Sequence, residues 1–347
     1  MTVLSESFDP RRNSLNALRL VLAVLVIVSH SWPIGGYGHD PGDGDLTLGA
    51  WAVAGFFAIS GYLITASRLH SSGLLDYMWR RALRIYPAFV VVLLVVAFGF
   101  APVSVLSRNS GHWDPTESLG YVVANLGIRI TQNGIPGTLV DVPFPEAWNG
   151  SLWTLWYEFL CYIAIGIAVS LIPRRLLGPA AIVATIGCAA ATWALRDLQL
   201  PLALVNATTL GGYFAAGMLM YCYRGRVAMA WYFAAASTAI VLIAAATSTF
   251  RMFAAIPAAY LMMWLGSTLP LQRVGAVNDV SYGTYIYAFP TQQLLATLGM
   301  GQILPVWGFI LVSIGCTLPF ACLSWFLVER PAMRLKSLVK QRRALTT

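Results

Sequence analysis

The sequence contains few charged residues. Of its 347 residues, 10% are charged and 58% are hydrophobic, and the mean hydropathy is +0.69. A soluble domain carries about 25% charged residues. No long polar segment separates the apolar stretches, so a separate soluble domain is not expected. We therefore predict a single membrane-embedded domain over residues 1–347.

Other absences exclude further classes of protein. The cysteines form no CxxC pair and no cluster with histidine, so neither a metal site nor a disulfide framework is predicted. The first apolar stretch is too long for a signal peptide and lacks a small-residue cleavage pattern, so we expect it to remain as an anchor. The chain shows no internal repeat, which gives little support to an inverted-repeat transporter.

Ten apolar stretches of spanning length are present instead. They cover residues 15–34, 49–67, 85–102, 151–172, 178–195, 203–222, 229–248, 252–269, 280–298 and 305–328. This pattern predicts an all-α polytopic membrane protein with about ten transmembrane helices. The stretch 119–132 is too short to span and is interrupted by Asn125 and Arg129, so we interpret it as a re-entrant or interfacial piece.

The basic residues are distributed unevenly over this topology. With the N-terminus inside, all but four of the 22 Lys and Arg fall on the cytoplasmic side, and the exceptions are Arg108, Arg129, Arg196 and Arg251. The positive-inside rule therefore predicts that both termini are cytoplasmic. It also explains the net charge of +8 without a nucleic-acid partner.

Arg19 and His30 lie inside the first apolar stretch. An ionisable side chain in a membrane helix costs roughly 2.5–3.5 kcal/mol on insertion scales, so such residues are usually retained for function. The two are eleven residues apart, which places them on nearly one helical face and about 16 Å apart along the axis. A structural alternative is that Arg19 reaches the headgroups while His30 bonds a neighbouring helix.

Two further clusters follow. Residues 55–62 are rich in small side chains, which indicates close helix packing, and Ser60 could also line a cavity. Arg81 and Arg84 share a helical face, and guanidinium groups at this spacing suit a phosphate or pyrophosphate. A topogenic cluster that touches anionic lipid explains the two arginines equally well.

A last cluster covers residues 149–158. Ser151 and Glu158 are seven apart, which predicts one shared helical face. A carboxylate such as Glu158 within a span must pair with a cation, stay protonated or line water. A base on the outer side and cations on the inner side suit group transfer across a bilayer, although proton-coupled transport would use similar residues.

In their order along the chain, these clusters resemble the acyltransferase-3 family of integral membrane O-acyltransferases. The matching elements are Arg19 with His30, Phe56 to Leu63, Arg81 to Pro87, Ser151 to Glu158, Ser281 to Tyr285, and Glu329-Arg330-Pro331. The resemblance covers almost the whole chain. Many members have a second His where this chain reads Ala288-Phe289-Pro290, so none can be assigned there. Some members also carry a C-terminal hydrolase-like domain, which is not expected here; hand-off to an acceptor would need the core itself or another protein.

The resemblance implies an enzyme of the bacterial inner membrane that takes an acyl group, usually from cytoplasmic acetyl-CoA. Typical acceptors are hydroxyls of extracytoplasmic or lipid-linked glycans, and some relatives acylate macrolides. The expected catalytic residues are His30 as general base, Arg19 as an electrostatic partner, and Glu158. The expected donor site comprises Arg81, Arg84, Tyr86 and Ser60. The expected acceptor site comprises Ser151 and Trp153.

Two rival interpretations stay open at this point. One is a proton-coupled exporter of a lipid or glycan, with His30 and Glu158 as relay residues. The other is a non-catalytic scaffold in a glycan-assembly complex. We expect no metal and no nucleic acid, and the sequence leaves the acceptor, the acyl length and the oligomeric state open.

Overall fold

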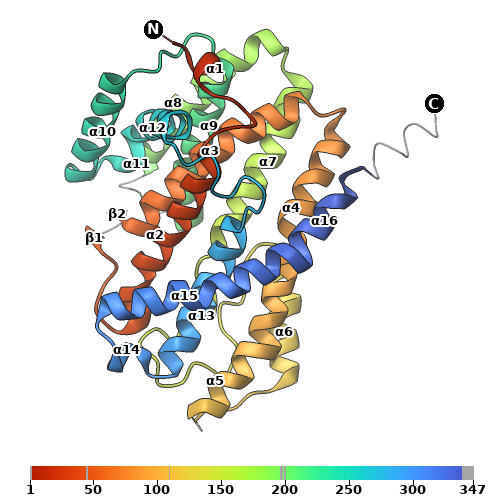
Figure 1. Cartoon of the computed structure of the whole chain (residues 1–347), viewed down its shortest axis with the longest axis vertical. Coiled ribbons are helices and arrows are strands. Elements are labelled where there is room, and N and C mark those ends of the chain that lie inside the picture. Colours follow the sequence, from red (N-terminus) through yellow and green to blue (C-terminus); the bar gives the residue numbers. More distant parts are fainter. Residues whose placement is uncertain (1, 44–45, 109, 196–197, 199–200, 338–347) are drawn as a thin grey trace. The chain divides into compact units, whose positions relative to one another are not determined.

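The computed structural model describes residues 2–43, 46–108, 110–195, 198 and 201–337. Helices make up most of this part of the chain (Figure 1). Its only strands are β1 (Gly42–Asp43) and β2 (Leu46–Thr47), which pair antiparallel. The all-α class that the sequence predicts is therefore confirmed.

Each of the ten predicted stretches is largely helical. Within the part of the chain that the structure describes, seven helical segments are long and apolar enough to cross a membrane: Leu15–Gly35, Leu48–Leu69, Leu74–Arg108, Trp153–Leu171, Arg174–Leu195, Leu202–Cys222 and Val306–Arg334. Three others are shorter than the roughly 20 residues of a typical span; they are α10 (Trp231–Ala246), α12 (Ala255–Thr268) and α13 (Ser281–Thr297). A multi-pass membrane protein is confirmed, and the number ten stays a prediction.

The chain divides into two compact units. The first unit comprises Met1–Leu22, Ala50–Met78 and Tyr157–Val277, and the second comprises Ala23–Gly49, Trp79–Trp156 and Asn278–Thr347. The boundaries fall within α2 (Leu15–Gly35), α3 (Leu48–Leu69), α4 (Leu74–Val95) and α7 (Trp153–Leu171), so each of these helices contributes residues to both units.

In the first unit, α8 packs along α9 and α12 packs along both α9 and α10. Its elements, besides parts of α2, α4 and α7 and almost all of α3, are α1 (Leu4–Ser7), η2 (Arg174–Leu176), α8 (Leu177–Leu195), α9 (Leu202–Cys222), α10, α11 (Phe250–Phe253) and α12. Helices α3 and α9 meet through Gly61 and Gly217. A Cβ atom on Gly61 would clash with the Phe214 carbonyl, and one on Gly217 would clash with the Ala58 carbonyl. The small-residue cluster at 55–62 therefore acts as a packing surface.

This close contact predicts a large stability difference between two glycines. We expect Gly217→Ala to destabilise the protein by about 1–3 kcal/mol, because the new methyl group meets backbone atoms that no rotamer change can move. Gly187→Ala is the matched control, since nothing lies within 4 Å of its Cβ position in α8. Thermal unfolding of the purified variants in detergent measures the difference, and equal midpoints would contradict the packing argument.

In the second unit, α13 is the central helix and packs along α15. The other elements are α5 (Ala101–Arg108), α6 (Pro115–Asn125), α14 (Met300–Ile303), α15 (Val306–Ser324), α16 (Arg330–Arg334), the π-helices η1 (Val96–Phe100) and η3 (Trp325–Glu329), and η4 (Leu335–Ser337). All residues of α13 except Leu294 are buried, and several of them are polar. A buried helix with polar side chains is well suited to line a site.

Two helices differ in their bounds from the apolar stretches of the sequence. Helix α4 begins at Leu74 rather than at 85, because the arginine-rich segment before the apolar stretch is itself helical. Helix α6 covers Pro115–Asn125 rather than 119–132. Asp114 begins it as an N-cap that accepts a hydrogen bond from the Thr116 N–H at 2.7 Å, which holds the pKa of Asp114 below its ordinary value.

Candidate functional site

His30 lies in the C-terminal half of α2, against the buried face of α13. Its ring meets the Phe289 ring edge-to-face, with the centroids 5.1 Å apart. The Nδ1 atom is buried and has no hydrogen-bond partner among the described residues. This imidazole nitrogen is therefore not committed to a hydrogen bond with a protein group.

Hydrogen bonds fix the helix turn that carries His30. Gln292 of α13 donates from Nε2 to the Ile27 carbonyl at 2.9 Å and to Ser31 Oγ at 2.8 Å. Ser29 donates to Asp40 Oδ1 at 2.7 Å and accepts from the Gly49 N–H at 2.8 Å. The residues directly before and after His30 are therefore both held, and a carboxylate is brought to this turn.

The segment 149–151 packs against the same helix. Asn149 donates from Nδ2 to the Ile286 carbonyl at 2.8 Å, and the Tyr285 hydroxyl donates to the Ser151 carbonyl at 2.6 Å. A Cβ atom on Gly150 would lie 2.7 Å from the Phe289 ring, so only glycine fits there without displacing that ring. Asn149 Oδ1 and Ser151 Oγ are buried without partners among the described residues.

One spacing argument does not hold. Helix α7 begins at Trp153, so Ser151 lies in the turn that precedes the helix. The prediction that Ser151 and Glu158 share one helical face is therefore wrong, because the bonds of the Ser151 carbonyl to Tyr285 and Thr154 hold a turn there. Trp153 is the first residue of α7, and its side chain is partly exposed at 39%.

Arg84 is bound to two carboxylates. Its guanidinium lies 2.6 Å from Asp279 Oδ2 and 3.2 Å from Glu329 Oε2. Glu329 is buried and also accepts a hydrogen bond from Ser324 Oγ at 3.1 Å. The Trp325 ring, 5.9 Å away, covers the guanidinium. Arg84 thus joins α4 to the start of α13 and to η3.

Arg81 differs from Arg84 in its surroundings. Its Nε atom is buried and has no hydrogen-bond partner among the described residues. Lys336 lies close by: burial lowers its pKa, and the charges of Arg81, Arg84 and Arg80 lower it further. A group of cations close enough to lower the pKa of a neighbouring lysine favours the binding of an anionic ligand. Tyr86, on the next turn of α4, is 40% exposed.

In the first unit, two hydroxyl groups hold Glu158. Ser60 Oγ donates to Glu158 Oε1 at 2.8 Å, and the Tyr162 hydroxyl donates to the same oxygen at 2.6 Å. These bonds meet part of the need for polar partners that a carboxylate has within a span. Arg19 belongs to the same unit and is half-buried on α2.

The predicted site residues are divided between the two units. The second unit holds His30, Arg81, Arg84, Tyr86, Ser151 and Trp153, whereas the first unit holds Arg19, Ser60 and Glu158. Within the described ranges, no group of three or more His, Cys, Asp or Glu could hold a metal ion.

The sequence reasoning missed four residues around His30. Asp40 is not part of any motif in the sequence, and Phe289 stands there only as a departure from the family pattern. Asn149 and Gln292 were not considered as site residues. A signal was present for Gln292, since a buried amide inside an apolar stretch is costly unless it is used.

Comparison with known proteins shows which family this chain belongs to. A family model described as an acyltransferase domain matches residues 12–329. The chain belongs to the acyltransferase-3 family. A protein of Shigella phage Sf6 named O-acetyl transferase is 30% identical over 331 residues, with 92% of this chain and 96% of the relative covered. Nodulation protein 10 of Rhizobium leguminosarum bv. viciae is 28% identical, with 98% of each chain covered.

No solved structure matches the chain. Membership in the acyltransferase-3 family, together with the long apolar helices, makes this protein a multi-pass membrane acyltransferase. As an acyltransferase it uses an acyl donor and an acceptor, and the arrangement around His30 and Arg81 is where we look for both.

Proposed function

We propose that this protein transfers an acetyl group from cytoplasmic acetyl-CoA to a hydroxyl of an extracytoplasmic or lipid-linked glycan, in a bacterial inner membrane. The observation that carries this proposal is the buried, unbonded Nδ1 of His30 on a turn fixed from both sides. The name of the phage relative supports O-acetyl transfer. An anionic donor is supported by the basic cluster of the second unit, which consists of Arg80, Arg81, Arg84 and Lys336.

His30 acts as the general base in this proposal. Its neutral imidazole takes the proton from the acceptor hydroxyl while the oxygen attacks the thioester carbonyl. The carbon–oxygen bond forms, the carbon–sulfur bond breaks, and the thiolate of CoA leaves and takes up the proton from the imidazolium. Arg19 would stabilise charge on the donor, while Ser151 and Trp153 would contact the acceptor.

We assign the donor phosphates to Arg81 and Lys336. Tyr86 and Ser60 are further proposed donor-binding residues. Arg84 also belongs to the donor site, but two carboxylates already neutralise its charge, so we place it there as a residue that positions α4. Glu158, held by Ser60 and Tyr162, orients a positive group or the acceptor.

Arg81→Ala is expected to weaken CoA binding by about tenfold or more with the fold intact, since one charge-assisted hydrogen bond contributes about 1.5–3 kcal/mol. Arg81→Lys should recover only part of the affinity, because the planar fork is lost. Calorimetric titration of the purified protein with CoA measures both. Unchanged CoA affinity in both variants would show that Arg81 does not bind the donor and would favour the alternative, a topogenic arginine that contacts anionic lipid.

Sealed vesicles of known orientation test the function as a whole. Labelled acetyl-CoA supplied only to the cytoplasmic face should acylate glycan, because the basic cluster lies on the side that the arginine distribution assigns to the cytoplasm. Acetyl-CoA supplied only outside should give no product. Equal activity from both faces would overturn the proposed sidedness. No acylated product from either face would favour the exporter, which moves its cargo without modifying it.

A further inference from the structure

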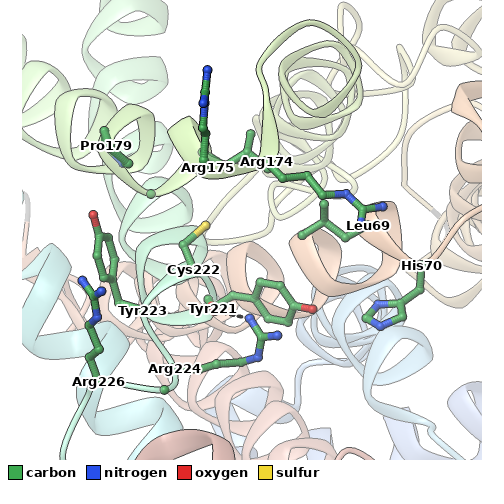
Figure 2. Close-up of a pocket in the computed structure, with 13 residues that line it drawn as sticks. Leu69, His70, Arg174, Arg175, Pro179, Tyr221, Cys222, Tyr223, Arg224 and Arg226 are labelled. Atoms are coloured by element: carbon green, nitrogen blue, oxygen red, sulfur yellow. Dashed lines mark hydrogen bonds between the residues drawn. The ribbon is translucent and has the colours of Figure 1, made fainter.

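A separate pocket of about 830 Å³ lies within the first unit. None of the residues that line it has a role in the acyl transfer proposed above. Residues at the C-terminal end of α3, the start of α8 and the C-terminal end of α9 line it (Figure 2). Three short stretches supply them, residues 69–70, 174–179 and 221–226.

Four arginines line this pocket. They are Arg174, Arg175, Arg224 and Arg226; His70 lies beside them, and no carboxylate is among the lining residues. Figure 2 shows Arg174 on one side and Arg224 and Arg226 on the other, with Cys222 between them. Among the described residues, no salt bridge joins Arg174 or Arg226 to an acidic group. Such a concentration of like charge gives the pocket a positive potential that favours the binding of an anion.

Arg224 has a fixed orientation within the pocket. It donates to the Tyr221 carbonyl at 2.9 Å, and its guanidinium lies 4.2 Å from the centroid of the Tyr221 ring. Tyr221 is buried, so this cation is anchored to the body of the first unit. Arg174 and Arg226 are exposed and can adjust to a bound group.

The pocket lies where apolar helices end. Helix α7 ends at Leu171 and α8 begins at Leu177, so Arg174 marks a membrane boundary. Large apolar side chains close in sequence to the lining residues of α8 are exposed: Leu171 is 77% exposed, Leu176 is 47% exposed and Val183 is 70% exposed. A ligand that fits both features has an anionic head and a hydrocarbon tail.

We propose that this pocket binds the phosphate headgroup of an anionic membrane phospholipid, with the acyl chains along the exposed side of α8. Arg174 and Arg226 contact the phosphate from opposite sides, and Arg224 supplies the fixed charge behind it. A soluble phosphate compound would satisfy the arginines but would leave the apolar surface of α8 unused. This site is independent of the proposed acyl transfer.

Native mass spectrometry of the purified full-length protein tests this proposal. Phosphatidylglycerol is titrated against wild type and against the double variant Arg174→Gln/Arg226→Gln, with phosphatidylcholine as the neutral lipid. We expect one tightly held phosphatidylglycerol on wild type and about tenfold weaker binding on the double variant. Arg273→Gln is the matched control, because it removes an exposed arginine of the same unit that does not line the pocket.

Three outcomes would overturn the proposal. The first is unchanged phosphatidylglycerol binding in the folded double variant. The second is equal retention of phosphatidylcholine by wild type. The third is displacement of the lipid by millimolar inorganic phosphate or CoA, which would make the pocket a site for soluble phosphates. If the double variant fails to fold, the single exchange Arg226→Gln on an exposed side chain supplies the same comparison.

Discussion

Replacement of His30 by alanine is expected to lower acyl transfer by about 10²–10⁴-fold, the usual contribution of a general base. The imidazole Nδ1 is buried without a protein partner, and the residues on both sides of His30 are held by Asp40 and Gln292. Loss of the ring therefore removes the proton acceptor and leaves its support in place. Labelled acetyl-CoA and a glycan acceptor provide the assay, with protein abundance measured in parallel.

Two further variants make this test specific. His30→Gln keeps the size and the hydrogen-bonding capacity of the side chain but not its basicity, so it should be little better than alanine. His112→Ala removes an exposed histidine of the same unit and should leave turnover unchanged. Near-wild-type turnover in well-expressed His30→Ala would show that another group accepts the proton.

Arg84→Ala is expected to destabilise the protein by about 3–5 kcal/mol, the typical effect of removing one partner from a buried ion pair. The change takes away the cation that both Asp279 and the buried Glu329 contact, and it removes the group that Trp325 covers. The attachment of η3 and of the start of α13 to α4 should weaken together. Thermal unfolding in detergent, followed by size exclusion, measures the effect.

Arg84→Lys separates this structural role from donor binding. A lysine keeps the charge but cannot reach two carboxylates with a planar fork, so an intermediate stability is expected. If Arg84→Ala unfolds at the wild-type temperature and loses only CoA affinity, then Arg84 binds the donor directly and the two carboxylates are not its main partners.

The helical fold was largely predictable from sequence, because apolar stretches of spanning length have few alternatives in a membrane. The differences between the apolar stretches and the observed helix bounds have specific causes. Arg80, Arg81 and Arg84 lower the local hydropathy, so the apolar stretch does not include the first three turns of α4. The Asp114-Pro115 pair was a readable helix start, yet the apolar count placed α6 four residues later.

The site was predictable only in part. The apolar pattern placed His30 on a membrane helix, but the contacts that fix its turn come from Asp40, in the loop that follows the helix, and from Gln292, which is 261 residues from Ser31 in sequence. Spacing also grouped Arg81 with Arg84, and it could not show that Asp279 and Glu329 already neutralise Arg84. Contacts between distant segments depend on packing, which a single sequence does not display.

The contact between Gly61 and Gly217 limits which sequences could share this fold. A Cβ atom at Gly55 would meet the end of the Leu22 side chain, 2.9 Å away, so a smaller residue at 22 could compensate. At Gly61 and Gly217 the obstacle is the backbone of the opposite helix, which no second substitution can shorten. In an evolving lineage or a mutational library, position 55 can therefore drift together with position 22, whereas positions 61 and 217 should each retain glycine regardless of the background.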